Sequence, residues 1–309
     1  MKYILLIFFL ATFGLFAQEL PPIQNFYPSD YHGENQNWAI SQSHEKIIYV
    51  ANSKGLLEFN GASWKLYPSP NETIMRSVNV IEDRIYTGCY MEFGYWEKNN
   101  LGTLDYTSLS TQLPLELIED EEFWNIINID DYVVFQSFKQ IYISNLNDGS
   151  INIIDSKSTI TKMFKVDKNI YFQRMGEGIF KIESGKDFLV FDEDIVKDDE
   201  VINIFRSEKE VLVLTKNNGF YHLKDGELIS ADNFPNAFLS RLSLYDGLQL
   251  RDDGFVLGSI SNGLLYLKES GELVHQINQD SGLLNNTVLS LFEDVENTVW
   301  LGLDYGIGY

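Results

Sequence analysis

A short apolar tetrad that recurs along the chain restricts the folds open to it. Seven tetrads are present: Ile48-Tyr-Val-Ala51, Ile85-Tyr-Thr-Gly88, Val133-Val-Phe-Gln136, Ile170-Tyr-Phe-Gln173, Val211-Leu-Val-Leu214, Phe255-Val-Leu-Gly258 and Val299-Trp-Leu-Gly302. Their starts lie 37 to 48 residues apart, and their β-branched and aromatic residues favour strands. A repeat of this length built on strands indicates a repetitive all-β architecture.

A second feature follows each tetrad. Seven to nine residues after the tetrad starts, a turn leads into a new apolar run, and glycine opens six of the seven runs. These positions are Gly55, Gly94, Gln140, Gly178, Gly219, Gly263 and Gly306. Because glycine adopts positive φ freely, the pattern predicts a tight hairpin at each site.

Each repeat is predicted to hold four short strands. In the second repeat they cover 74–80, 84–88, 93–97 and 104–107, with turn residues at 82–83 and 99–102. No long segment has a 3.6-residue period, so helices should be scarce. We predict a seven-bladed β-propeller of four-stranded antiparallel blades, with the tetrads on the second strands. A solenoid of such sheets is the alternative, but a closed ring leaves fewer exposed edges.

The two ends of the chain raise separate questions. Residues 1–17 carry one cation, Lys2, and an apolar run from Ile4 to Phe16, which is typical of a signal peptide for export, with an uncleaved anchor as the alternative. Residues 18–309 would form the propeller. Tyr309 falls inside the third strand of the seventh blade, so we expect that blade to be incomplete. Either residues 24–31 supply a strand or, as we favour, the chain is a fragment of a longer protein.

Charge and cysteine content exclude several functions. A formal charge of −22 argues against nucleic acid, whose phosphates require a basic surface. The single cysteine, Cys89, permits neither an internal disulfide nor a Cys/His metal cluster. We therefore expect no cofactor and no metal, and a fold stabilised by burial.

The last 22 residues carry the strongest motif. The segment 286–307 resembles the two-component-regulator propeller repeat, whose pattern is matched by Val288, Ser290, Glu293, Asp294, Trp300, Gly302 and Gly306. Asn297 replaces the usual turn glycine, and Leu303 replaces a threonine. The earlier repeats match this pattern only loosely.

The start of the mature chain is similar to the N-terminus of triple-tyrosine-motif regulators, through residues 35–40 and 55–64. The resemblance implies a periplasmic sensor that a β-sandwich, a membrane helix and a cytoplasmic kinase or helix-turn-helix output domain would follow. The implied partners are those downstream domains beyond Tyr309 and a small-molecule ligand, with a carbohydrate fragment as the candidate. A homodimer is compatible with this arrangement.

Catalytic motifs are not evident. The four histidines, His32, His44, His222 and His275, are far apart and stand beside no cysteine or paired carboxylates, so no catalytic residue is assigned. The acidic run 192–200 could bind a hard cation, but it lacks alternating ligand spacing and is better interpreted as a solvated loop. Asp294, Asn297 and Trp300 resemble the structural aspartate box of sialidases, and Trp300 is interpreted as a filler between blades.

Candidate ligand-binding residues follow from the expected position of the inner strands. Counting back about ten residues from each tetrad and applying period-2 alternation selects five polar residues near the axis: Arg76, Asn125, Lys162, Asn203 and Asp246. The alternative is a water-filled channel without a specific ligand.

The function that fits these features best is a non-catalytic periplasmic sensing module of a signalling protein. An extracellular glycosidase or lyase that acts on polysaccharide, and a protein-interaction scaffold, stay open as alternatives.

Overall fold

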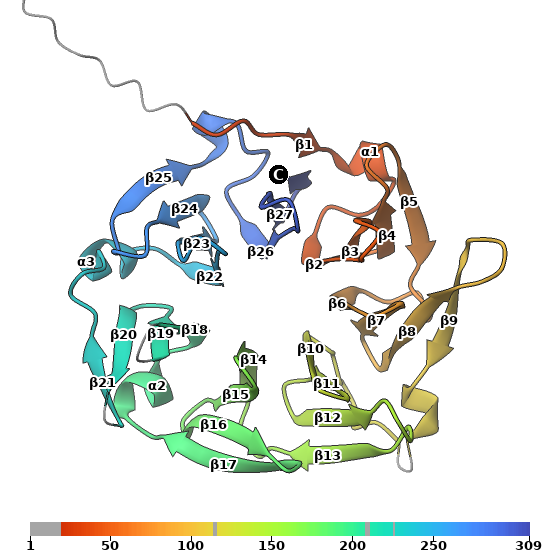
Figure 1. Cartoon of the computed structure of the whole chain (residues 1–309), viewed down its shortest axis with the longest axis horizontal. Helices are drawn as coiled ribbons and strands as arrows, with labels where there is room; N and C mark the ends of the chain where they lie inside the picture. The colour runs from red at the N-terminus through yellow and green to blue at the C-terminus, as the bar shows by residue number, and fades with distance from the viewer. Residues whose placement is uncertain (1–19, 114–115, 208–210, 225) are drawn as a thin grey trace, which may run out of the picture.

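The computed structural model describes residues 20–113, 116–207, 211–224 and 226–309. Seven four-stranded antiparallel sheets surround a central axis like the blades of a propeller (Figure 1). The predicted fold class is therefore confirmed. The predicted signal peptide, residues 1–17, lies outside the described residues.

The first four blades each use consecutive strands of the chain. Blade 1 contains β2 (Asn37–Gln42), β3 (Ile48–Asn52), β4 (Gly55–Phe59) and β5 (Trp64–Pro68). Blade 2 contains β6 (Met75–Ile81), β7 (Arg84–Cys89), β8 (Glu92–Lys98) and β9 (Leu104–Ser108). Blade 3 contains β10 (Asn125–Ile129), β11 (Tyr132–Gln136), β12 (Gln140–Asn145) and β13 (Ile151–Asp155). Blade 4 contains β14 (Ile160–Val166), β15 (Asn169–Arg174), β16 (Gly178–Glu183) and β17 (Lys186–Phe191).

The next two blades follow the same order. Blade 5 contains β18 (Val201–Arg206), β19 (Val211–Thr215), β20 (Gly219–Lys224) and β21 (Glu227–Ser230). Blade 6 contains β22 (Leu244–Gln249), β23 (Phe255–Ser259), β24 (Leu264–Leu267) and β25 (Leu273–Ile277). The described helices are single turns in connections: α1 (Pro28–Tyr31), α2 (Asp194–Asp198), α3 (Asn236–Leu239) and the 3₁₀ helices Ser110–Gln112 and Gln279–Ser281. No helix in the described part of the chain is long and apolar enough to span a membrane.

Blade 7 is closed by the N-terminal segment. It contains β26 (Val288–Glu293), β27 (Val299–Leu303) and β28 (Ile307–Gly308), and its outermost strand is β1 (Asn25–Phe26). Backbone hydrogen bonds between Gln24 and Tyr309, of 2.8 and 2.9 Å, extend the pairing of β1 with β28. The expectation of an incomplete last blade was wrong, because β1 satisfies the edge of β28. The alternative that residues 24–31 supply a strand is confirmed.

The strand positions within the repeats agree with the sequence pattern. Every tetrad lies on the second strand of its blade. Tight hairpins explain only part of the requirement for glycine at these positions. A Cβ atom at Gly55, Gly178 or Gly263 would lie 2.1–2.2 Å from a carbonyl oxygen of the neighbouring outer strand, and all three have positive φ. Gly94 lies inside β8 without positive φ, so only the close approach to the Thr107 carbonyl, at 2.2 Å, requires glycine there.

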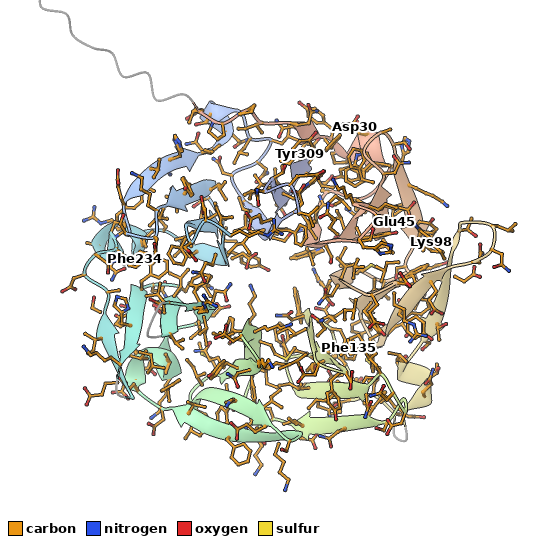
Figure 2. The ribbon with its side chains drawn as sticks, viewed as in Figure 1. Asp30, Glu45, Lys98, Phe135, Phe234 and Tyr309 are labelled. Carbon is orange, nitrogen blue, oxygen red and sulfur yellow. The ribbon has the colours of Figure 1, made fainter. Side chains whose placement is uncertain are left out.

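The core lies between neighbouring blades. Seven clusters of buried apolar residues fill these interfaces, and Figure 2 labels a member of two of them, Phe135 and Phe234. Trp300 belongs to the cluster between blades 7 and 1, with its ring centroid 5.9 Å from that of Phe59. Its predicted role as a filler between blades is confirmed.

Candidate functional site

An axial cavity of about 480 Å³ is the candidate site. Its lining comes from the innermost strands β2, β6, β10, β14, β22 and β26, from the end of β11, and from residues that precede or follow strands of blades 3 and 5. These strands surround the centre of the ring in Figure 1. The cavity therefore combines side chains from blades that are far apart in sequence.

A β-bulge near the start of the inner strand recurs around the ring. The pairing of the inner strand with the second strand shifts by one residue in blades 1, 2, 4, 5, 6 and 7. The shift falls at Trp38 in blade 1, Arg76 in blade 2 and Tyr245 in blade 6. A bulge redirects one side chain out of the regular alternation.

In six blades the bulge places one residue at the same level of the ring, and in blade 3 the equivalent residue is Trp124, which directly precedes β10. Six of the seven equivalent residues line the cavity: Trp38, Arg76, Trp124, Thr161, Tyr245 and Leu289. The seventh, Ile202, is buried in a core cluster instead. One aromatic-rich layer of side chains thus forms most of the wall.

Arg76 contacts two indole rings. Its guanidinium carbon is 4.2 Å from the centroid of the Trp38 ring and 4.4 Å from that of Trp124. The two tryptophans pack edge to face at 5.8 Å, and Phe138 extends the aromatic wall with its ring 5.2 Å from Trp124. Cation–π contacts of this kind stabilise a cation that has lost most of its water. The side chain of Arg76 is 12% exposed.

Three polar atoms of the cavity lining have no hydrogen-bond partner among the described residues. They are Nε1 of Trp124, Nε of Arg76 and Oε1 of Gln136, and all three are buried. Buried polar atoms in folded proteins nearly always have a partner, either in the protein or in a bound molecule. The residues of the lining therefore contain two donors and one acceptor that no described residue satisfies.

The charged groups of the cavity are already paired. Lys162 lies 2.6 Å from Asp246, whose second oxygen accepts a hydrogen bond from the backbone N–H of Leu291. Arg76 contacts Glu122 at 3.4 Å. Glu200 pairs with Lys216 at 2.7 Å. Little net charge is left to attract an ionic ligand.

Tyr245 provides a neutral hydroxyl in the same wall. Burial, and then the negative charge of Asp246, raises the pKa of Tyr245 to about 12, although nearby Arg76 opposes the shift. The phenol therefore stays protonated over the whole physiological range and can both donate and accept a hydrogen bond.

The five predicted site residues have different positions. Arg76, Asn125, Lys162 and Asp246 line the cavity, whereas Asn203 is not part of its lining. The amide of Asn125 donates to the carbonyl of Met163, at 3.0 Å, and the amide of Asn203 donates to the carbonyl of Gly247, at 2.5 Å. Both amides therefore bridge neighbouring inner strands.

Sequence reasoning missed the aromatic half of the wall: Trp38, Trp124 and Tyr245. Trp124 and Tyr245 each stand one position before the selected residue of their blade, Asn125 and Asp246, and no residue was selected in blade 1. The bulges at Trp38 and Tyr245 are invisible to a period-2 count. A signal was available in the sequence. When the inner strands are aligned on their buried first residues, several blades have a large residue at the next position.

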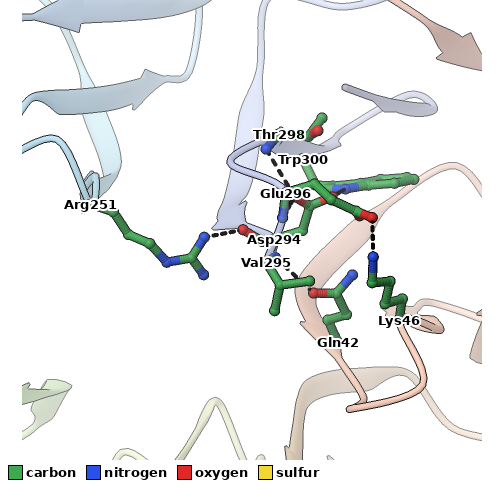
Figure 3. A network of polar contacts seen from close by, with 8 residues as sticks. All are labelled: Gln42, Lys46, Arg251, Asp294, Val295, Glu296, Thr298 and Trp300. Carbon is green, nitrogen blue, oxygen red and sulfur yellow. Dashed lines mark hydrogen bonds and ion pairs between the residues drawn. The ribbon is translucent and has the colours of Figure 1, made fainter.

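The aspartate-box turn of blade 7 is structural, as predicted. Asp294 accepts hydrogen bonds from the backbone N–H groups of Glu296 and Thr298 and from Nε1 of Trp300, each at 2.9 Å (Figure 3).

Neighbouring blades hold this turn from both sides (Figure 3). Arg251 of blade 6 donates to the Asp294 carbonyl, and Gln42 of blade 1 accepts from the Val295 N–H at 2.9 Å. Lys46 pairs with Glu296 at 2.6 Å. The turn therefore connects three blades.

The acidic run 192–200 likewise makes structural contacts. Asp199 accepts hydrogen bonds from the backbone of Asn217 and from the side-chain amides of Asn217 and Asn218, at 2.7–2.9 Å. Glu193 accepts from the N–H of Leu228 at 2.7 Å. Within the described residues, no group of three or more acidic, histidine or cysteine side chains could hold a metal ion.

Comparison with solved structures places this architecture among known propellers. The extracellular domain of BT4673 from B. thetaiotaomicron, described as a one component or hybrid two component system, superposes with a TM-score of 0.72 at 19% identity over 93% of this chain. The extracellular domain of BT3049, also described as a hybrid two component system, gives 0.71 at 14% identity over 93%. The chain has the propeller fold of these domains.

The similarity to these domains covers only part of their length, and it extends to an enzyme. The chain spans 39–41% of the lengths of the BT4673 and BT3049 domains. A catalytically inactive variant of virginiamycin B lyase from Staphylococcus aureus, solved with quinupristin, also matches, with a TM-score of 0.71 at 14% identity and 98% of its own length covered. No family model and no curated protein matches the chain.

Proposed function

We propose that this chain is the ligand-sensing propeller of an exported signalling protein and that it binds its ligand without turning it over. Two observations of different kinds support this: the fold is shared with extracellular domains of one and two component systems, and segment 286–307 resembles the propeller repeat of such regulators. The periplasm is the compartment that fits this function, with tethering to the membrane by domains beyond Tyr309.

The axial cavity carries the proposal. It is large enough for a small ligand, it is walled by Trp38, Trp124 and Phe138, and three buried polar atoms of its lining residues have no partner in the described part of the chain. Mostly apolar walls with a few convergent polar groups are typical of ligand sites.

The chemistry of the wall favours a neutral, polyhydroxylated ligand such as a carbohydrate fragment. Hydroxyl groups accept from Trp124 and Arg76 and donate to Gln136, while the C–H face of a sugar ring packs on an aromatic ring. An anion would have to displace Glu122 from Arg76 or Asp246 from Lys162. The paired cations therefore position the wall rather than attract charge.

The test is binding by calorimetry and thermal shift with a panel of neutral and acidic oligosaccharides. A neutral oligosaccharide at a hundredfold excess over its Kd should stabilise the native state by about 2.7 kcal/mol. Trp124→Ala should weaken binding at least tenfold. Tyr132→Ala is the matched control: it removes an exposed aromatic at the start of β11, outside the lining of the axial cavity, and should leave binding unchanged.

The lyase likeness makes an enzyme the second candidate, because that neighbour matches over nearly its whole length. The cavity holds Glu200, Asp246 and Tyr245, and each could act on a proton. Turnover of a polysaccharide or ester that is lost in Asp246→Asn would replace the sensing proposal with this one. Neither binding nor turnover across the panel would favour an interaction scaffold.

A further inference from the structure

The outermost strand of blade 4 is unusually apolar for an exposed sheet edge. In β17, Phe188, Leu189 and Val190 are 49, 53 and 38% exposed. Among the outermost strands in the described residues, only β21 has another large exposed apolar side chain, Ile229. An apolar strand with an unpaired edge is a template for pairing with another strand.

Blade 4, like blade 1 with three lysines and two glutamates in residues 37–68, has more basic than acidic residues. Residues 160–191 contain six Lys or Arg and four Asp or Glu, although the chain as a whole carries −22. The segment that follows, 192–200, contains six acidic residues and one lysine. The strand β17 therefore begins with a lysine, Lys186, and leads at its other end into an acidic segment.

We propose that β17 is a self-association edge, at which two copies of the chain pair antiparallel about a two-fold axis near Leu189. Two-fold pairing brings the beginning of one strand against the end of its copy. Lys186, three residues before Leu189, then lies opposite Asp192 of the other copy, three residues after it.

The local contacts leave this pairing open. Lys186 forms no ion pair within the described residues, and Asp192 forms only a long one, 3.7 Å from Lys197. Asp187 points its charge inward, to Arg174 at 2.6 Å, so it does not oppose a second copy. Two such edges would bury Phe188 and Leu189 against their counterparts while forming two ion pairs.

The self-complementary charge is the reason to choose a second copy over an unrelated partner. Two chains of charge −22 repel one another, and blade 4, with six basic and four acidic residues, opposes the approach of a second copy less than the acidic blades do. One strand edge and three apolar side chains bury less than about 1,200 Å², so the dimer should be weak, with a Kd in the micromolar range or above. The inference is independent of the axial ligand.

Cysteine cross-linking of the whole chain tests the geometry. Because the native Cys89 is buried, Leu189→Cys provides a single reactive thiol that meets its own copy only if the axis passes near it. Mild oxidation should give a covalent dimer of Leu189→Cys at least ten times faster than of Ile229→Cys, the matched control on β21. Equal rates would overturn the proposal.

Charge reversal tests the register by sedimentation velocity at increasing protein concentration. Lys186→Asp and Asp192→Lys should each weaken dimerisation at least fivefold, and the double variant should restore it. Unchanged melting temperatures would show that all three variants are folded. A chain that is monomeric up to about 1 mM, or a dimer that Leu189→Lys leaves intact, would refute the edge, and in the second case another surface would be the interface.

Discussion

The interfaces between blades 7 and 1 and between blades 3 and 4 are built in opposite ways. Aromatic rings fill the first, where Phe59 and Trp64 stack at 4.6 Å and Phe26 packs on both. The second is filled mainly by isoleucines and contains a cavity of about 730 Å³.

Chain connectivity explains the difference. A short segment links β13 to β14, so blades 3 and 4 stay close even when their side chains pack loosely. Blade 7 and blade 1 lie at opposite ends of the chain, and the ring closes there through the short pairing of β1 with β28 and a few polar contacts, such as those of Val295 with Gln42 and of Glu296 with Lys46. Burial must supply the stability that connectivity does not. The interface between blades 7 and 1, called the closure interface below, should therefore be the least tolerant of substitution.

The two regions also differ in how a buried carboxylate is hydrogen-bonded. Asp294, near the closure interface, has three hydrogen-bond donors. Glu121, which precedes β10 of blade 3, is 1% exposed, and neither of its carboxylate oxygens makes a hydrogen bond within the described residues. Burial raises the pKa of Glu121, against the opposing influence of Ser137 and Lys139, while Asp155 adds to the rise.

The largest expected effect is at the closure interface. Trp300→Ala should lower the free energy of unfolding by about 3–5 kcal/mol, because it removes a buried ring that contacts Phe59 and Tyr309. Chemical denaturation of the whole chain measures the loss. The matched variant is Ile170→Ala, which borders the existing cavity between blades 3 and 4 and should cost about 2 kcal/mol. An equal or smaller loss for Trp300→Ala would mean that closure is not the critical interface.

The next effect concerns the two carboxylates, which should respond with opposite signs. Asp294→Asn should destabilise the chain by about 1–3 kcal/mol, because an amide cannot accept all three hydrogen bonds. Glu121→Gln should stabilise it by about 1 kcal/mol at pH 8, since the variant buries no charge.

The pH dependence of Glu121 has a definite sign. Below the unfolded-state pKa, near 4.5, the carboxyl is protonated in both states and costs nothing. As the pH rises through the raised folded-state pKa, the native state pays for an ionised buried group, so stability falls. The difference in melting temperature between Glu121→Gln and the native chain should vanish at pH 4 and grow toward pH 8. A constant difference would exclude ionisation as the cause.

The closure interface also shows what sequence can and cannot predict. Trp300 and its tetrad were predicted correctly because a large residue in a strand repeat has one natural place, between blades. The strand β1 has two residues, too few for any periodicity to reveal. Its pairing with β28 depends on the position of the last residues, up to Tyr309, in the folded ring, and no local sequence pattern encodes that position.

The axial site has the same division. Arg76, Lys162 and Asp246 were selected by alternation and do line the cavity. Trp124 was missed because it directly precedes β10, and Tyr245 because a bulge shifts the alternation by one residue. Trp38 also lies at a bulge, in blade 1, from which no candidate was selected. Bulges depend on the partner strand, so a single strand's sequence does not show them.

The smallest effect distinguishes a filled interface from an unfilled one. Ile182→Phe adds apolar volume beside the cavity between blades 3 and 4, where the extra atoms replace empty space or solvent. We expect a gain in the free energy of unfolding of less than about 1 kcal/mol. Leu57 is fully buried in the closure interface, so enlarging it in Leu57→Phe should cost about 1–3 kcal/mol through strain. Denaturation curves of the two variants compare the same kind of enlargement in both places. A loss of stability in both variants would show that the cavity accepts added volume no better than the closure interface does. It would contradict the argument that chain connectivity permits loose packing between blades 3 and 4, whereas burial must stabilise the interface between blades 7 and 1.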